Sequence, residues 1–248
     1  MIAEKLDGLM LYLQEQAMFN GSILLRDKDT IYIRHNGVSE QSTGVKTNDL
    51  TTYDLCSVSK PFTALAILML REQGRLSLED GLDSFVPELS FYSGIRIMQL
   101  LNHTSGIPDY TQLFHEHWNP LEVACNTDFL DFLVQFRPKP LFEPGSRWEY
   151  SNTGYVLLSI IVERATGITF GEFLKNHVFE KVGLKHTRLP ESVGDNQTLY
   201  DAVGYIRGED GSFIRSDQLP ETRYAFIWAV FVEMDPSALL LRICAGLT

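Results

Sequence analysis

Cysteine is scarce in this 248-residue sequence, and its three copies, Cys56, Cys125 and Cys244, lie far apart. This spacing gives neither a disulfide framework nor the paired cysteines of a zinc site. Positively charged residues are also in the minority: the sequence has 21 lysines and arginines against 32 aspartates and glutamates, which gives a formal net charge of −11. Such an excess of negative charge argues against a general nucleic-acid binder and against a protein that adheres to anionic membranes.

The sequence also lacks a hydrophobic run long enough to cross a bilayer, and it has no internal repeat. Glu4, Lys5 and Asp7 interrupt the apolar residues at the start, which is not the pattern of a secretory signal, so we expect a cytoplasmic protein. With 44% hydrophobic and 21% charged residues, the composition is ordinary for a soluble globular protein. The length allows one large domain or two small ones, with an ample core.

Apolar periodicity and turn residues divide the chain into a mixed set of elements. They predict helices over 2–17, 55–70, 95–101, 128–137, 154–165 and 170–178, and strands over 22–27 and 30–35. A helix and a hairpin therefore precede a region that is mostly helical. This order indicates an α+β fold.

The stretch Leu55–Leu70 organises the rest of the chain. It opens with small polar residues, from which we expect Ser57 or Cys56 to cap the helix. Pro61 falls in the first turn, where a missing N–H does little harm. Apolar residues follow on every side, so we expect a helix that is buried nearly all round.

Ser57 and Lys60 are three residues apart in this stretch and therefore share one face of the first turn. A serine hydroxyl becomes a good nucleophile when a nearby base takes its proton. A lysine acts as that base only where its surroundings favour the neutral amine, and a helix N-terminus can stabilise an oxyanion. Ser-x-x-Lys is thus a candidate nucleophile and base pair, although a bare Ser-x-x-Lys also occurs by chance on exposed helix faces.

A second candidate stretch, Phe142–Tyr155, lies between two predicted helices. If Tyr150–Asn152 is extended, Tyr150 and Asn152 point to the same side. A tyrosine hydroxyl can relay protons, and an asparagine amide can hold a carbonyl or amide of a substrate. A buried aromatic ring and a loop asparagine are the alternative interpretation.

Three motifs occur in one order: Ser57-Val58-Ser59-Lys60, the Asn102–Tyr110 loop with His103-Thr104-Ser105-Gly106, and Glu143–Tyr155 with Tyr150-Ser151-Asn152. Together they resemble the serine β-lactamase and penicillin-binding-protein superfamily over about residues 20–205. The most similar branch is that of class C β-lactamases, D-alanyl-D-alanine peptidases and esterases. The resemblance implies an α/β sandwich with a helical subdomain, and a serine hydrolase that works through an acyl-enzyme.

The resemblance also implies the role of each motif residue. Ser57 is the acylated nucleophile, Lys60 its proton partner, Tyr150 the general base and later acid, and Asn152 a ligand of substrate and lysine. The Ser57 backbone N–H supplies half of the oxyanion hole. Cys56 lies four residues before Lys60, so helix geometry alone leaves a thiol nucleophile open, but the motif register favours Ser57.

The sequence departs from the family in its third motif, a Lys-Thr-Gly or His-x-Gly on a late strand. Lys181-Val182-Gly183 and His186-Thr187-Arg188 come too soon after Tyr150, and we reject both. From about residue 224 the composition changes, and we expect a chain truncated before the last strands of the sheet. A buried helix in place of those strands is the rival interpretation.

We therefore expect one incomplete domain over 1–248. Its parts are an N-terminal helix and hairpin (1–55), a mostly helical region with the motifs (56–190) and a divergent tail (191–248).

The expected ligand is a small molecule, namely a β-lactam, a D-alanyl peptide or an ester, and we expect no cofactor. His115 and His117 flank Glu116, but a spacing of two does not put them on one helix face, so no metal site is expected. The competing hypothesis is a non-catalytic remnant that at most binds ligands.

Overall fold

The computed structural model describes residues 2–16, 18–119, 124–189, 201–208, 211–215 and 231–233. Its helices are α1 (Ile2–Glu15), η1 (Cys56–Ser59), α2 (Lys60–Glu72), η2 (Leu82–Ser84), η3 (Pro87–Tyr92), α3 (Ile97–Leu101), α4 (Tyr110–His117), α5 (Asn126–Phe136), α6 (Asn152–Thr166), α7 (Phe170–Leu174), the π-helical turn η4 (Lys175–Phe179) and α8 (Glu180–Val182). Its strands are β1 (Gly21–Asp27), β2 (Thr30–Asn36), β3 (Thr52–Asp54), β4 (Tyr205–Arg207), β5 (Phe213–Arg215) and β6 (Phe231–Glu233).

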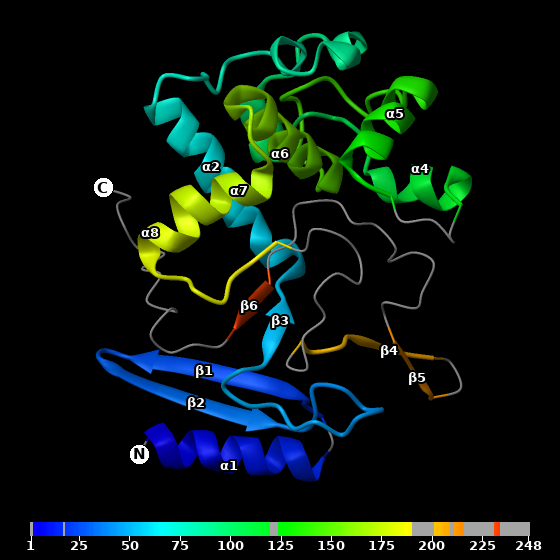
Figure 1. The fold of residues 1–248 in the computed structure, drawn as a ribbon. Helices are drawn as coiled ribbons and strands as arrows, with labels where there is room; N and C mark the ends of the chain where they lie inside the picture. Colours follow the sequence, from blue (N-terminus) through cyan, green and yellow to red (C-terminus); the bar gives the residue numbers. More distant parts are fainter. Residues whose placement is uncertain are drawn as a thin grey trace.

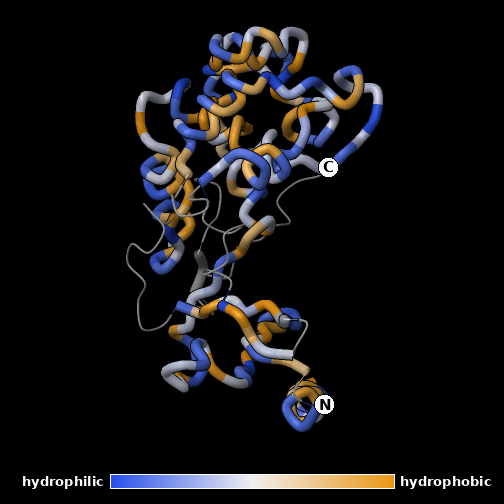
Figure 2. The backbone as a smooth tube through the Cα atoms, turned by 90° about the vertical axis from the view of Figure 1, so that its right-hand side faces the viewer, coloured by the Kyte–Doolittle hydropathy of each residue, from blue (hydrophilic) through white to orange (hydrophobic). Residues whose placement is uncertain are grey.

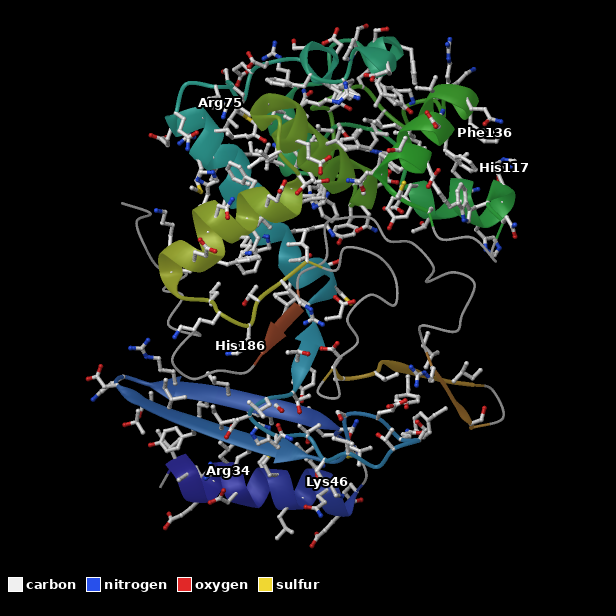
Figure 3. The ribbon with its side chains drawn as sticks, viewed as in Figure 1. Arg34, Lys46, Arg75, His117, Phe136 and His186 are labelled. Atoms are coloured by element: carbon white, nitrogen blue, oxygen red, sulfur yellow. The ribbon has the colours of Figure 1, made fainter. Side chains whose placement is uncertain are left out.

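The N-terminal part is a helix packed on a hairpin. β1 and β2 pair antiparallel along their whole length, as the sequence predicts. α1 lies along one face of this hairpin (Figure 1). The Arg34 side chain, labelled in Figure 3, leaves β2 on that face and donates a hydrogen bond to Asp7 of α1 at 2.5 Å.

The other face of the hairpin is fastened to β3 by side-chain hydrogen bonds. The Ser22 hydroxyl lies 2.7 Å from His35 Nδ1 and 2.6 Å from the Tyr53 hydroxyl. His35 Nε2 in turn lies 2.9 Å from Asp49 Oδ1. Because Tyr53 belongs to β3, these bonds fix the strand that runs directly into the turn before Ser57.

The helical part is built around α6, whose residues 153–162 are all buried. α2, α3 and α7 pack against it. Gly154 allows the close approach of α3, since a Cβ there would lie 3.2 Å from the Leu100 carbonyl oxygen. Figure 2 shows hydrophobic stretches gathered among these helices and along the hairpin beneath them. The core that carries the candidate site therefore lies in the helical part.

The expectation that the helix after Ser57 is buried nearly all round is wrong. One face of α2 is buried, through residues such as Ala66, Ile67 and Leu70, whereas Leu65 is 38% exposed and Met69 only half-buried. α2 packs on α6 and α7, and its Phe62 ring meets the Phe179 ring of η4 edge to face at 5.6 Å between centres. The helix that is buried nearly all round is α6.

The expected helix cap is also wrong. Neither Cys56 nor Ser57 caps with its side chain. Asp54 instead accepts the Cys56 N–H at 2.7 Å just before the first turn, which is the 3₁₀ helix η1 with Leu55 as its N-cap. The Ser57 hydroxyl is thereby left for other partners.

The remaining predicted helices form with small shifts at their ends. The stretch 95–101 becomes α3, 128–137 becomes α5, and 170–178 becomes α7 followed by η4. The Thr169–Glu172 capping box is present at the start of α7. α4 was not predicted from the sequence, because its eight residues mix aromatic rings with His115, Glu116 and His117.

The strands among the described residues form three separate antiparallel pairs, β1–β2, β3–β6 and β4–β5. β4 and β5 pair through Tyr205–Arg207 and Phe213–Arg215. β6 is extended and pairs with β3, which contradicts a helix at residues 231–233. The rest of the expected divergent tail, over 191–200 and most of 216–248, lies outside the described residues.

Candidate active site

The turn between β3 and α2 presents Ser57. Cys56 adopts a left-handed backbone conformation, with φ 45°, which is uncommon for a residue other than glycine. Asp54 holds the Cys56 N–H, and the Ser59 hydroxyl donates to the Cys56 carbonyl oxygen at 2.5 Å. These two bonds hold the residue before Ser57 in its unusual conformation, and strain of this kind is often found at functional sites.

The structure brings together all four side chains that the motifs single out. The Ser57 Oγ lies 2.7 Å from the Tyr150 hydroxyl and 3.2 Å from Lys60 Nζ. Lys60 Nζ also donates to Asn152 Oδ1 at 2.9 Å. Ser57 and Tyr150 are 93 positions apart in the sequence, so this contact depends entirely on the packing of α2 against the start of α6.

The site combines the exposed hydroxyl groups of Ser57 and Tyr150 with the buried ammonium group of Lys60. Lys60 is 6% exposed, whereas Tyr150 is 40% exposed and Ser57 is also exposed. Lys60 Nζ lies 5.0 Å from the centre of the Tyr150 ring and 5.4 Å from that of Tyr155, distances typical of cation–π contacts. Burial raises the pKa of the Tyr155 hydroxyl, which donates to the Leu101 carbonyl oxygen and is not in the serine network.

Cys56 is not arranged as a nucleophile. Partial burial, together with the neighbouring Asp54 carboxylate, raises the pKa of the Cys56 thiol. A raised pKa keeps the thiol protonated, and the thiolate is the reactive form. The geometry thus supports Ser57 over Cys56 as the candidate nucleophile.

The segment that carries Tyr150 and Asn152 is held by the Asn102–Tyr110 loop. The Glu149 N–H donates to the His103 carbonyl oxygen at 2.9 Å, and the Ser151 N–H donates to His103 Nδ1 at 3.3 Å. The Asn152 N–H donates to Asp109 Oδ2 at 2.6 Å. In the sequence His103 stood out only as part of a motif, with no role of its own, and nothing singled out Asp109.

Gly106 lets this loop lie against the segment that precedes the site. Its φ is +79°, and a Cβ there would lie 2.3 Å from the Phe142 carbonyl oxygen. The Gly106 carbonyl oxygen also accepts the Leu141 N–H at 2.8 Å. A glycine is therefore required here both for its conformation and for the space.

The two rejected third-motif candidates lie on other kinds of structure. Lys181 is in α8, and Gly183 follows that helix in a left-handed conformation. His186, labelled in Figure 3, lies on the connection after α8, and Arg188 pairs there with Asp201 at 2.7 Å. Neither candidate is on a strand, whereas the third motif of the family lies on one.

Metal ligation has no support within the part of the chain that the structure describes, where no group of three potential ligand side chains is found. His117 instead stacks on the Phe136 ring, 4.3 Å between centres, at the outer edge of the helical part (Figure 3). Glu116 lies 3.7 Å from His117 Nε2.

The family of this chain follows from its similarity to known proteins. Residues 13–225 match the family model for β-lactamase. A penicillin-binding protein of Bacillus subtilis (strain 168) is 38% identical over 217 residues, covering 86% of this chain and 48% of its own length. The chain therefore belongs to the β-lactamase family.

Solved structures agree with the α+β fold. A penicillin-binding protein from Bacillus halodurans superposes with a TM-score of 0.78 at 27% identity, covering 90% of this chain and 68% of that one. A class C β-lactamase superposes with a TM-score of 0.71 at 20% identity, covering 93% of this chain and 61% of that one, which shows the fold alone.

The chain spans about half the length of the curated relatives it matches, 48% for the Bacillus subtilis protein and 50% for a β-lactamase of Providencia stuartii. Among the described residues, no helix is long and apolar enough to cross a membrane.

Proposed function

We propose that this chain transfers acyl groups through a covalent acyl-enzyme on Ser57. The observation that carries the proposal is the position of the Ser57 Oγ, which lies 2.7 Å from the Tyr150 hydroxyl and 3.2 Å from Lys60 Nζ. Both distances are within hydrogen-bonding reach for proton transfer. The family to which the chain belongs supports the same chemistry.

Each side chain has one role in the proposed reaction. In the reacting state Tyr150 is a phenolate, stabilised by the buried Lys60 cation. Ser57 Oγ attacks the substrate carbonyl carbon while this phenolate takes the serine proton, which makes Tyr150 a neutral phenol. Tyr150 then returns the proton to the leaving group as the carbon–leaving-group bond breaks. Asn152 keeps Lys60 in place through its side-chain oxygen and turns its amide NH₂ toward substrate. Water completes the cycle by hydrolysing the ester on Ser57.

The proposed substrates are carbonyl compounds with a good leaving group: a β-lactam, a peptide ending in D-alanine, or a small ester. The relatives support the first class, since they include a penicillin-binding protein and a β-lactamase. The oxyanion donor proposed on this chain is the Ser57 N–H, which lies in the first turn of η1.

The test is covalent labelling followed by intact-mass spectrometry. The purified chain is incubated with a labelled penicillin or a fluorophosphonate, and the modified residue is located by peptide mapping. We expect one adduct per chain on Ser57, which is lost in Ser57→Ala and kept in Cys56→Ala. Ser22→Ala is the matched control, because the Ser22 hydroxyl also bonds a tyrosine hydroxyl, that of Tyr53, but lies outside the Lys60 cluster.

Two results contradict the proposal. Labelling lost only in Cys56→Ala assigns the thiol as the nucleophile. A folded chain that gains no mass with either probe supports the rival hypothesis of a non-catalytic remnant.

A further inference from the structure

His103 contacts Tyr150 and both of its neighbours in the chain. The residues on either side of Tyr150 both donate their backbone N–H to His103: Glu149 to its carbonyl oxygen at 2.9 Å and Ser151 to its Nδ1 at 3.3 Å. The His103 ring also lies against the Tyr150 ring, with 4.6 Å between centres and 32° between planes. One residue thus holds both the backbone and the ring of Tyr150.

His103 itself is held in a defined position. Its φ of 60° is left-handed, and its ring packs against Tyr155 at 5.2 Å and, edge to face, against Trp148 at 6.1 Å. A histidine nitrogen that accepts a hydrogen bond is unprotonated, so Nδ1 carries no proton and Nε2 carries one in the neutral ring. A proton on Nδ1 would face the Ser151 N–H and abolish the bond.

We propose that neutral His103 is the positioning residue that sets Tyr150 against Ser57, and that protonation of His103 switches acylation off. This inference rests on the proposed function of Ser57. His103 touches neither the Ser57 hydroxyl nor a reacting atom, and it acts through Tyr150. A displacement of a reacting group by about 1 Å is enough to cost on the order of 100-fold in rate.

The charges around His103 favour the neutral ring. Burial lowers the pKa of its imidazole, and the Lys60 cation lowers it further. The Asp109 carboxylate acts in the opposite direction, and Tyr150 and Tyr155 also face the ring. Protonation therefore occurs below the ordinary value of 6.5, so the site is assembled at neutral pH and disabled in acid.

Two substitutions separate the hydrogen bond from the ring. In His103→Asn, the side-chain oxygen takes the place of Nδ1 as the acceptor and is not protonated between about pH 5 and pH 8. Asparagine also tolerates the left-handed backbone conformation of this position. In His103→Phe, the ring remains but the acceptor is lost. His117→Gln is the matched control, because His117 also stacks on an aromatic ring but lies on α4, away from Tyr150.

The first measurement is the rate constant for Ser57 labelling between about pH 5 and pH 8. We expect the wild type and His117→Gln to lose labelling in the acid part of this range. His103→Asn is expected to be labelled without that loss in acid. His103→Phe is expected to be labelled about 10- to 100-fold more slowly, which is the rate loss expected when a reacting group is displaced by about 1 Å. An acid loss that is unchanged in His103→Asn overturns the inference.

The second measurement does not depend on activity. In the ¹⁵N-histidine NMR spectrum we expect His103 as the Nε2–H tautomer, and we expect the Tyr150 ring signals to shift as His103 titrates, but not in His103→Asn. A protonated Nδ1 at neutral pH, or Tyr150 signals that ignore the titration, overturns the inference even if Ser57 labels. Absence of Ser57 labelling together with the expected NMR shifts contradicts the proposed function and leaves the positioning of Tyr150 supported.

Discussion

Asp109 and Asn152 are joined by a hydrogen bond of 2.6 Å from the Asn152 N–H to Asp109 Oδ2. The other carboxylate oxygen, Oδ1, accepts the Thr111 N–H at 3.0 Å and so caps α4. One carboxylate thus holds the first residues of two helices, α4 and α6. Since Asn152 is also the partner of Lys60, the start of α6 and the lysine are fixed relative to each other.

Asp109→Ala is expected to lower both stability and labelling. It removes a helix cap, worth about 0.5–2 kcal/mol, and leaves the Asn152 N–H without its acceptor, worth about 1–3 kcal/mol. Urea unfolding measures the loss of stability. Labelling of Ser57, measured where the variant is fully folded, is expected to slow at least about tenfold because Asn152 is free to move.

Asp128→Ala is the matched control for this variant. Asp128 accepts the Cys125 N–H at 2.8 Å at the start of α5, so its loss costs about 1 kcal/mol of stability. It does not contact the site, and we expect Ser57 labelling at the wild-type rate. Equal labelling rates in both variants would show that Asp109 serves stability alone.

Gly106→Ala is expected to destabilise the chain more than Gly167→Ala does. The two glycines have nearly the same φ, +79° and +78°, but a Cβ at Gly106 would meet the Phe142 carbonyl oxygen at 2.3 Å, whereas at Gly167 nothing lies within 4 Å. The backbone cost of about 1–2 kcal/mol is shared. Overpacking at Gly106 adds about 1–3 kcal/mol.

Urea unfolding of the two glycine variants isolates this contact, because the two positions have nearly the same φ. Gly106→Ala is also expected to slow Ser57 labelling, since the displaced loop carries His103 and Asp109. Free energies of unfolding that agree within about 0.5 kcal/mol would show that the close approach to Phe142 does not constrain the loop.

Turnover is expected to be far weaker than labelling. We found no Lys-Thr-Gly or His-x-Gly late enough in the sequence to supply the strand on which the family places its second oxyanion donor. Loss of one such donor costs about 100- to 1000-fold in rate. The chain is therefore expected to show little or no steady-state hydrolysis of nitrocefin or p-nitrophenyl esters while still acquiring a mass adduct.

A turnover assay run beside intact-mass measurements checks this expectation. Ser57→Ala is the control for any residual rate. Rapid hydrolysis that Ser57→Ala abolishes would show that the described network is sufficient for the whole cycle.

Local patterns in the sequence determined most of the elements. Alternation in 22–27 and 30–35 gave β1 and β2, because side chains of a strand point to opposite faces. The Thr169–Glu172 pair gave the start of α7, because a capping box is satisfied by residues three apart. The spacing of Ser57 and Lys60 likewise placed both on one helical face, because residues three apart are neighbours on a helix surface.

The tertiary structure decided which helix is buried and which residues hold the site. The composition of α2 suggested burial all round, but burial depends on what packs against a helix, and α6 holds that position. The contacts of His103 and Asp109 with the segment around Tyr150 join residues more than 40 positions apart. No local pattern encodes such a pairing, since it exists only once α3, α4 and α6 have packed together.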